Sequence, residues 1–460
     1  MSAESNNDFQ SMGKRERIIS GPIIRTVFAL AIPPVLGMLM EFALSVTDFY
    51  WVGRLGASAQ DAITSSMVLQ WTIFSFMTMI SVGVTALVSR SVGANEPERA
   101  AFYIRQAYRL AALLSLVVSV AGYILAPDVL DFMDAEPSTM VMAIPYLRIF
   151  FVSTIFFAIA ETTYASFRAS GDTRTPFIIA AVTVTINMAL DPLLIFGIGP
   201  FPELGVPGAS LATAIAIFVG MVSILVLLVR GRLGYRVPDL FSSPPDWKAM
   251  LKISRIGVPV STQQLTFVVV YWFLIKIVHQ FGDTAGAAMG IGNRMESFSY
   301  LTCYGFSLAA STMVGQNLGA KKPDRAERCA WWAVGLAIGM TGIMTVLFLT
   351  IPGQIAGIFT ENAEVRKIAS DYLFILGLSQ AAMAVEIVLE AAFGGAGNTI
   401  PPMVVLVPAA ILRVPLAYYL AFNAGWGING VWWTLTFTTF AKAAIMAFWF
   451  KLGRWKLKEV

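Results

Sequence analysis

The stretch VGANEPERA, Val92–Ala100, decides the fold, because a closely similar stretch, LGAKKPDRA, returns at Leu318–Ala326. Each stretch joins two apolar segments through a short polar turn. Gly93 and Gly319 are suited to end a helix with positive φ, and the proline four positions further on is suited to the first turn of the next helix. One such turn is ordinary, so the information lies in its recurrence.

Two further pairs of segments repeat at the same interval. FRASGDTRTP, 167–176, resembles FGGAGNTIPP, 393–402, and LAIPPV in the first half resembles IGVPV in the second. Matching positions are always 226 residues apart, as in Pro33 and Pro259, Pro97 and Pro323, and Gly171 and Gly397 (259 minus 33, 323 minus 97, 397 minus 171). A constant interval over much of the chain indicates two homologous halves.

The composition places this repeat in a membrane. Of the 460 residues, 57% are hydrophobic and 13% charged, whereas an ordinary soluble domain has about 25% charged residues. Apolar segments of about 20 residues or more are typical of membrane-spanning helices. The sequence predicts about twelve of them, at 24–52, 62–89, 101–126, 139–168, 175–197, 207–230, 250–279, 286–316, 327–351, 365–393, 401–422 and 427–451.

Lysine and arginine alternate between the connections of these spans. They precede the first span, fill the second, fourth, sixth and eighth connections, and close the chain. The third connection is acidic, with Asp128, Asp131, Asp134 and Glu136. Because cytoplasmic connections are enriched in basic residues, both termini are expected in the cytoplasm, in a cell (inner, cytoplasmic) membrane. Six spans per half make the two halves a parallel repeat, an arrangement that sandwiches a central cavity in many transporters.

The expected organisation is an all-α polytopic protein in five parts. These are an N-terminal tail at 1–20, a first lobe at 21–230, a linker at 231–249, a second lobe at 250–452 and a C-terminal tail at 453–460, with the tails and linker cytoplasmic. Residues 1–20 lack the apolar region of a signal peptide. Cys303 and Cys329 form no disulfide framework or CxxC motif. His279 is the single histidine, and HExxH and GxSxG motifs are absent, so an enzyme is not expected, and neither is a channel or nucleic-acid binding.

An aspartate inside an apolar run points to function. Asp191 lies in TINMALDPLLIFGIG, 185–199, about 16 residues and therefore about 24 Å into its helix. Asp48 lies late in the first span. An ionised carboxylate in the membrane is costly unless it is protonated, paired or bound to a cation. Asn187 is one turn before Asp191, on the same helix face. Pro192 leaves the carbonyl of Met188 without its helical hydrogen-bond donor. The carboxylate, amide and carbonyl oxygens together suit Na⁺ or H⁺.

The residues quoted above, with INMALDPLLIFG at 186–197 and GVPGASLATAIA at 205–216, resemble the multidrug and toxic compound extrusion family over about residues 20–450. The resemblance implies a V-shaped protein of two helical bundles around a central cavity, which exports amphipathic, mostly cationic compounds in exchange for Na⁺ or H⁺. It implies a cation site in the first lobe at Asp48, Asn187, Asp191 and Thr213. One branch of the family has a glutamate in the seventh span, where this chain reads STQQLTFVVVYWF, 261–273.

Other polar and aromatic residues are weaker candidates. Glu41, Glu386 and Glu390 are candidates for a second acidic site, with Arg294 or Arg413 as counter-ions. Pro33, Pro34 and Pro192 are candidate gating kinks, although a simple helix kink is the plainer interpretation. Candidate substrate contacts are Gln70, Trp71, Gln263, Gln264, Tyr271 and Tyr300, although an interfacial belt is the plainer interpretation for the tryptophan and the tyrosines.

The sequence therefore predicts a secondary multidrug exporter that works by alternating access as a monomer. Its partners are small cationic compounds and membrane lipid, its coupling ion is Na⁺ or H⁺ at Asp48 and Asp191, and no cofactor or further metal is expected. The alternative is a lipid or lipid-linked oligosaccharide flippase of the same superfamily, which would need a more basic cavity than the few interior arginines provide.

Overall fold

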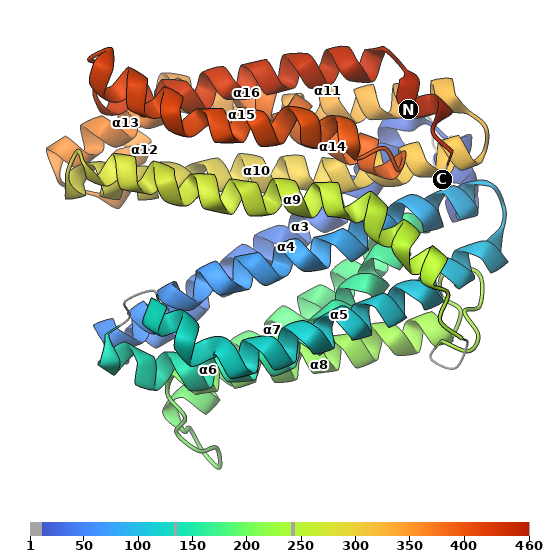
Figure 1. The fold of residues 1–460 in the computed structure, drawn as a ribbon, viewed down its shortest axis with the longest axis horizontal. Helices are drawn as coiled ribbons and strands as arrows, with labels where there is room; N and C mark the ends of the chain where they lie inside the picture. Colours follow the sequence, from blue (N-terminus) through green and yellow to red (C-terminus); the bar gives the residue numbers. More distant parts are fainter. Residues whose placement is uncertain (1–11, 133–135, 241–243, 460) are drawn as a thin grey trace, which may run out of the picture. The chain divides into compact units, whose positions relative to one another are not determined.

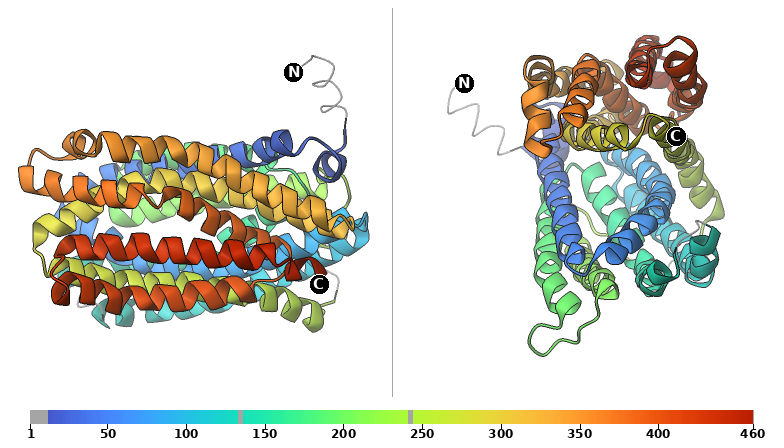
Figure 2. Two further views of the ribbon diagram at one scale, coloured as in Figure 1. Left: turned by 90° about the horizontal axis from the view of Figure 1, so that it is seen from above. Right: turned by 90° about the vertical axis from the view of Figure 1, so that its left-hand side faces the viewer.

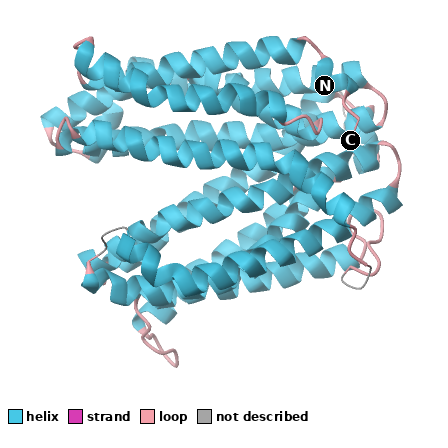
Figure 3. Ribbon diagram, viewed as in Figure 1, coloured by secondary structure: helices cyan, strands magenta, loops and turns pink. Residues whose placement is uncertain are grey.

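The protein consists of helices joined by turns and loops in the part of the chain that the computed structural model describes, residues 12–132, 136–240 and 244–459 (Figures 1 and 3). The first half contains α2 (Lys14–Ile19), α3 (Ile23–Gly53), α4 (Ala57–Gly93), α5 (Pro97–Phe132), α6 (Pro137–Ala169), α7 (Arg174–Phe196) and α8 (Val206–Val229). The second half contains α9 (Trp247–His279), α10 (Asp283–Gly319), α11 (Pro323–Thr350), α12 (Pro352–Phe359), α13 (Ala363–Gly377), α14 (Gln380–Gly395), α15 (Ile400–Tyr418), η1 (Tyr419–Asn423), α16 (Ile428–Lys451) and η2 (Arg454–Leu457).

The apolar helices support the prediction of a multi-span membrane protein. By length and composition, nine helices within the described ranges can cross a membrane, or ten if α13 and α14, bent by 56° at a short break, form one span. Helices α10 and α16 cover the other two predicted spans, 286–316 and 427–451. Helix α10 is rich in Gly, Ser, Thr and Ala, and α16 is rich in Thr and Ala. Both bury many of these residues, so their lower apolarity reflects contact with protein. Twelve spans therefore remain a prediction.

The repeated turns are alike in detail. Helices α5 and α11 begin at Pro97 and Pro323 as expected. The positive φ, however, falls on Asn95 (65°) and Lys321 (59°), and the expectation for Gly93 and Gly319 is wrong. The amide of the next residue in each turn bonds back to the preceding helix, Glu96 to Ser91 O at 2.9 Å and Lys322 to Asn317 O at 2.8 Å. These bonds take up carbonyls that the helix end leaves free.

The chain divides into two compact units that do not coincide with the predicted lobes. Unit 2 is Leu36–Gly257, and unit 1 joins the described residues up to Val35 with those from Val258 onward. The boundaries fall inside α3 and α9, next to Pro33–Pro34 and Pro259, and not in the linker at 231–249. Within unit 2, the start of α9 crosses α4 closely, since a Cβ at Gly83 would lie 2.4 Å from Ile253 O.

Each unit has its own packing. In unit 2, α6 packs against α4, α5 and α8, and α7 packs against α8. In unit 1, α10 packs against α11, α13 and α14, while α16 packs against α14 and α15. A core of unit 1 includes Phe306, Phe393 and Phe450. Seen from above, the long helices within a unit run along nearly the same direction (Figure 2). The arrangement of the two bundles around a central cavity remains a prediction.

Parts of the predicted tails and linker are structured. Residues Lys14–Ile19 form α2, which packs against α10 with Ile18 and Ile19 buried. At the other end Trp455 of η2 is buried and stacks on Phe450, with ring centroids 4.4 Å apart. In the linker, Tyr235 bonds Ser170 Oγ at 2.9 Å, and burial raises the pKa of Tyr235 to about 12. Residues 1–11, 133–135 (including Asp134), 241–243 and 460 lie outside the described residues.

Candidate functional site

Helices α7 and α8 bring three predicted site residues together. They approach closely because Gly208 of α8 lies against the backbone of α7, where a Cβ would be 2.5 Å from Leu194 O. This packing brings Thr213 of α8 to Asn187 of α7, and the amide of Asn187 lies 3.0 Å from Thr213 Oγ1. Asn187 and Asp191 are both buried, Asp191 completely. The i, i+4 spacing seen in the sequence therefore makes one polar cluster.

The amide of Asn187 has two useful orientations. With its nitrogen toward Asp191, it donates to the two carboxylate oxygens at 3.0 and 3.1 Å and accepts from Thr213 Oγ1 at 3.0 Å. With its oxygen toward Asp191, the nitrogen donates to Thr213 instead. The first orientation satisfies an ionised carboxylate, whereas the second presents an oxygen beside it, as a cation requires.

Asp48 of α3 completes this cluster. Its carboxyl group and that of Asp191 are close enough to share a hydrogen bond, which requires one of them to carry a proton. Oxygen Oδ1 of Asp48 is shielded from solvent, and no donor in the described residues reaches it. Two adjacent carboxylates repel each other when both are ionised, so the pair favours binding a proton or another cation. We call Asp48, Asn187, Asp191 and Thr213 the carboxylate cluster.

A tyrosine that the sequence did not single out lies beside the carboxylate cluster. Tyr146 of α6 interacts electrostatically with both Asp48 and Asp191. Its hydroxyl accepts a hydrogen bond from Gln70 Nε2 of α4 at 3.2 Å, and its backbone oxygen accepts one from Ser210 at 2.9 Å. Gln70, a predicted substrate contact, is thus placed near the carboxylate cluster. A tyrosine in an aromatic-rich span gave no periodic signal that could have identified it.

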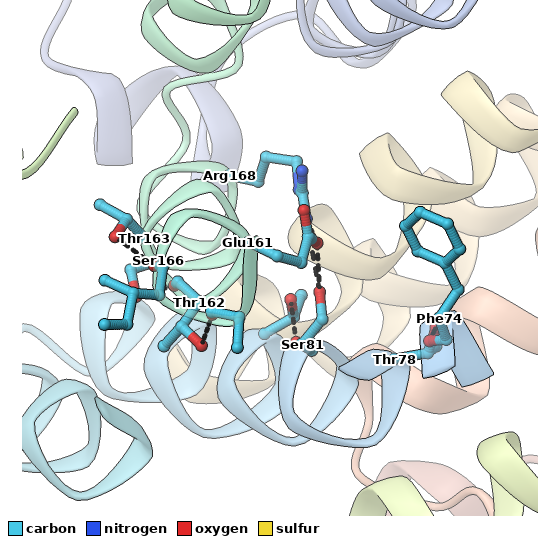
Figure 4. A network of polar contacts seen from close by, with 11 residues as sticks. Phe74, Thr78, Ser81, Glu161, Thr162, Thr163, Ser166 and Arg168 are labelled. Atoms are coloured by element: carbon cyan, nitrogen blue, oxygen red, sulfur yellow. Dashed lines mark hydrogen bonds and ion pairs between the residues drawn. The ribbon is translucent and has the colours of Figure 1, made fainter. Parts of the chain in front are cut away.

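A second polar network in unit 2 connects α4 and α6 (Figure 4). Arg168 Nη2 pairs with Glu161 Oε1 at 2.5 Å, and Ser81 Oγ donates to the same oxygen at 2.9 Å. Glu41 of α3 interacts electrostatically with Glu161 and Arg168. The predicted second acidic site therefore separates, since Glu41 belongs to this network of unit 2 and the other two glutamates belong to unit 1.

The glutamates of α14 lie in a charged cluster of unit 1. Glu386 Oε1 pairs with Lys442 Nζ of α16 at 2.5 Å, and Glu390 interacts electrostatically with both. Lys442, and not Arg294 or Arg413, makes this ion pair; Arg413 donates to Thr438 and Thr439 at 2.8 and 3.1 Å. Glu296 of α10 lies near Arg413 and Lys442. We call Glu296, Glu386, Glu390, Arg413 and Lys442 the unit 1 charge cluster.

The remaining candidates lie in varied environments. Gln263 is buried and donates to Pro259 O at 3.0 Å, while its Oε1 has no described partner. Tyr271 bonds Asn293, and Trp71 and Tyr300 are exposed. Gln264 is half-buried. Helices α3 and α7 continue through Pro33, Pro34 and Pro192, so gating at these prolines remains a prediction, as do the substrate contacts.

The cation chemistry of the carboxylate cluster differs from that of a transition-metal site. Across the ranges that the structure describes, no group of three or more His, Cys, Asp or Glu side chains is placed to hold a metal ion. The donors present are carboxylate, amide and hydroxyl oxygens, which suit a proton or a hard monovalent cation. A polytopic helical protein with repeated halves and buried carboxylates belongs, as a class, with the membrane transporters.

The comparison with family models identifies the family. The MatE model matches residues 33–193 and again 259–419, together well over half of the chain. The two matches begin and end 226 residues apart (259 minus 33, 419 minus 193), the interval found in the sequence repeat. The chain belongs to the MatE family of transporters, the multidrug and toxic compound extrusion family.

Relatives and solved structures agree with this assignment. The chain is 27% identical over 450 residues to a probable multidrug resistance protein NorM of Thermotoga maritima, covering 95% of this chain and 94% of that protein. It is 24% identical over 409 residues to an FAD transporter of Shewanella oneidensis, covering 88% and 90%. An outward-facing multidrug resistance MATE transporter shares the fold, with a TM-score of 0.90 at 20% identity, covering 98% of this chain and all of that one.

Proposed function

We propose that this transporter exports amphipathic cationic compounds in exchange for Na⁺ or H⁺ that binds at the carboxylate cluster. The observation that carries the proposal is the contact between Asp48 and Asp191, in which Asp48 Oδ1 has no described donor. A proton or Na⁺ between the two carboxyl groups would relieve their repulsion. The names of relatives such as the probable multidrug resistance protein support drug-like substrates.

The coupling follows from competition between ion and drug for one negative site. A cationic compound enters the inward-open transporter while the carboxylates are ionised. After the transporter opens outward, an external ion binds to Asp48 and Asp191 and neutralises them, so the cationic compound leaves. The membrane potential adds about 2.3 kcal/mol per net charge per 100 mV to this exchange.

The amide of Asn187 would follow the state of the site. It donates to Asp191 when the carboxylate is ionised and turns its oxygen inward when Na⁺ is bound. Pro33 and Pro34 of α3 and Pro192 of α7 would supply the flexibility for alternating access. We place the protein in the cell membrane as a monomer with both termini in the cytoplasm, in accord with the alternation of basic residues.

The FAD transporter among the relatives adds anionic compounds to the substrate classes to be tested, because FAD is an anion. Cationic substrates are favoured here by the carboxylate cluster, which attracts positive charge. The lipid-linked flippase is not favoured, because the MatE model matches both halves of the chain. A dye panel of cations, neutral compounds and FAD separates these substrate classes.

Efflux from proteoliposomes tests the proposed function. A fluorescent cationic dye is loaded, and Na⁺ and pH gradients are imposed separately on the wild type and on Asp191→Asn. One gradient should stimulate wild-type efflux, and the variant should lose this stimulation by about tenfold or more, since a charge-assisted contact is worth about 1.5–3 kcal/mol.

The matched control is Asp61→Asn, the same change at an exposed carboxylate of unit 2 that accepts from Thr139 at 2.9 Å. It should keep the stimulation. Full ion-stimulated efflux by Asp191→Asn, or equal loss in both variants, would contradict the assignment of the coupling site.

A further inference from the structure

A basic groove lies at the end of unit 1 where α10 turns into α11. It has a volume of about 520 Å³ and is lined by Ile19, Ser20, Lys321, Lys322, Pro323, Asp324, Arg325 and Arg328. Arg328 also lines an adjoining groove of about 440 Å³, together with Glu327, Trp331, Trp332 and Gly335. The two grooves share one side chain and together run from charged residues to tryptophans along α11.

Two of the four cations of the groove have structural duties. Lys322 Nζ donates to Ile19 O at 3.0 Å, and Arg325 Nε donates to Ile18 O at 3.4 Å, so both hold α2 against the turn between α10 and α11. The side chains of Lys321 and Arg328 are exposed, and no hydrogen bond or ion pair joins them to any described residue. Their charges remain available to a ligand.

The neighbouring acids do not neutralise these charges. Asp324 and Glu327 both bind Lys456 of η2, at 3.0 and 2.6 Å from its Nζ. The contact with Glu327, followed by that with Asp324, raises the pKa of Lys456 and keeps it charged. Counting Lys456 with its two acids and the four cations of the groove, five positive charges face two negative charges. The groove therefore complements an anion.

The first repeat shows that this surface is not required by the turn itself. At the interval of 226 residues, Lys321 and Lys322 correspond to Asn95 and Glu96, and Arg328 corresponds to Phe102. Trp332 corresponds to Gln106, which is buried and holds the linker through Asp246 N at 2.9 Å and Pro244 O at 3.2 Å. In unit 2 the linker thus covers the surface that unit 1 leaves open and positively charged.

The adjoining aromatic residues place the groove at a membrane interface. Trp331 packs edge-on against Phe450, with centroids 5.9 Å apart, whereas Trp332 is 47% exposed. Tryptophans favour the level of the lipid headgroups, and α11 is apolar enough to span the membrane beyond them. Arg328 and Trp332 are one turn apart, so a phosphate at Arg328 would have its acyl chains beside Trp332.

We propose that this groove binds the headgroup of an anionic phospholipid, with the phosphate at Lys321 and Arg328 and the acyl chains along α11 beside Trp332. Such a lipid would lie against the turn between α10 and α11, and would stabilise the packing of α2 and η2 on this turn and the start of α11. The site is separate from the carboxylate cluster, so the proposal stands whether or not the proposed transport activity is correct.

Quenching of tryptophan fluorescence by brominated lipid tests the proposal on the full chain in vesicles. The quenching that depends on Trp332, obtained by difference from Trp332→Phe, is measured with brominated phosphatidylglycerol and with brominated phosphatidylcholine. The wild type should prefer phosphatidylglycerol. Removing the two free charges in Lys321→Asn/Arg328→Gln should lower this preference by about fivefold or more, because one basic residue near an anionic surface contributes about a fivefold effect.

The variant is chosen to keep the fold, because Asn95 occupies the same positive-φ position in the first repeat. The control is Lys451→Gln/Lys458→Gln, which removes two exposed charges at the same end of unit 1 but outside the groove. It should retain the preference. The proposal would be overturned if the wild type showed no preference for phosphatidylglycerol or if the control lost the preference equally. Complete displacement of the lipid by millimolar inorganic phosphate would also overturn it, because the site would then bind a soluble anion.

Discussion

The carboxylates of Asp48 and Asp191 are suited to bind an ion because the hydrogen bonds that neighbouring side chains offer them are incomplete. Asp48 Oδ1 has no described donor, and the amide of Asn187 can turn either its nitrogen or its oxygen toward Asp191. A fully bonded pair would be fixed in one state, whereas this pair can exchange an amide hydrogen bond for a bound ion. Buried polar groups without partners are costly, and here that cost favours ion binding.

Replacing Asn187 with alanine tests this role at the level of one residue. Asn187→Ala should raise the ion concentration that gives half-maximal efflux by about tenfold, because a lost hydrogen bond to a charged group is worth about 1.5–3 kcal/mol. The measurement is dye efflux against external Na⁺ or H⁺. Thr185→Val, an exposed change on the same helix, serves as the control. An Asn187→Ala shift no larger than the control's would argue against a role in ion binding.

The sequence alone predicted some contacts of the carboxylate cluster and missed the neighbouring Tyr146, and each outcome has a physical reason. Asn187 and Asp191 could be joined from their spacing, because one helix turn fixes their relation. Asp48 was singled out as a carboxylate inside an apolar span, whereas Thr213 followed only from the family resemblance. The contacts of both depend on how α3, α7 and α8 pack. Tyr146 was not found, because an interior tyrosine resembles the packing aromatics around it.

Helices and repeats were the predictable elements, because apolar length and the 226-residue interval are written in the chain itself. The position of the positive φ was not predicted, because hydrogen bonds at the helix end set it and the residue pattern does not show them. The positive φ lies at Asn95 and Lys321 because the amide of the following residue must reach a carbonyl of the preceding helix. The unit boundaries lie within α3 and α9 because the first part of each helix packs away from the rest of its own repeat.

The crossing of α9 and α4 gives a prediction at the scale of these elements. A Cβ at Gly257 would lie 1.9 Å from the backbone oxygen of Met79, and backbone cannot move aside as a side chain does. Gly257→Ala should therefore lower stability by about 1–3 kcal/mol or more, despite the helix propensity that alanine adds. Thermal unfolding of the purified protein measures this loss.

Gly339→Ala is the matched control for the glycine change. Gly339 also lies inside a helix, α11, but a Cβ there would meet nothing within 4 Å. Its stability should be unchanged or raised by up to about 1 kcal/mol. If Gly257→Ala were as stable as Gly339→Ala, the close crossing of α4 and α9 would be wrong.

For the whole molecule, the two repeats share a fold but not a chemistry. The position that matches Asp191 in the second half is Ala417, a buried alanine. Unit 1 carries instead three glutamates and two cations in its charge cluster, with Lys442 paired to Glu386. The first repeat thus contains the carboxylate cluster, and the second repeat contains a cluster of buried charges that includes an internal ion pair. Because the cations of this cluster are paired with or lie near its glutamates, a structural role is favoured, and the loss of a cation should differ in its effect from the loss of a glutamate.

Removing either partner of the Lys442–Glu386 pair should therefore have unequal effects. With all groups ionised, the unit 1 charge cluster has three negative and two positive charges. Lys442→Gln leaves three glutamates facing Arg413 alone and should cost about 3–5 kcal/mol of stability, as for an uncompensated buried charge. Glu386→Gln leaves two charges of each sign and should cost less. Thermal unfolding measures both losses of stability, with the exposed Lys451→Gln of the same helix as the control.

Lower pH should partly restore the stability of Lys442→Gln, because protonation of a glutamate removes the surplus negative charge. Equal losses of stability in Lys442→Gln and Glu386→Gln would exclude the proposed compensation of the buried glutamates by Lys442. A Lys442→Gln variant as stable as the control would exclude it too.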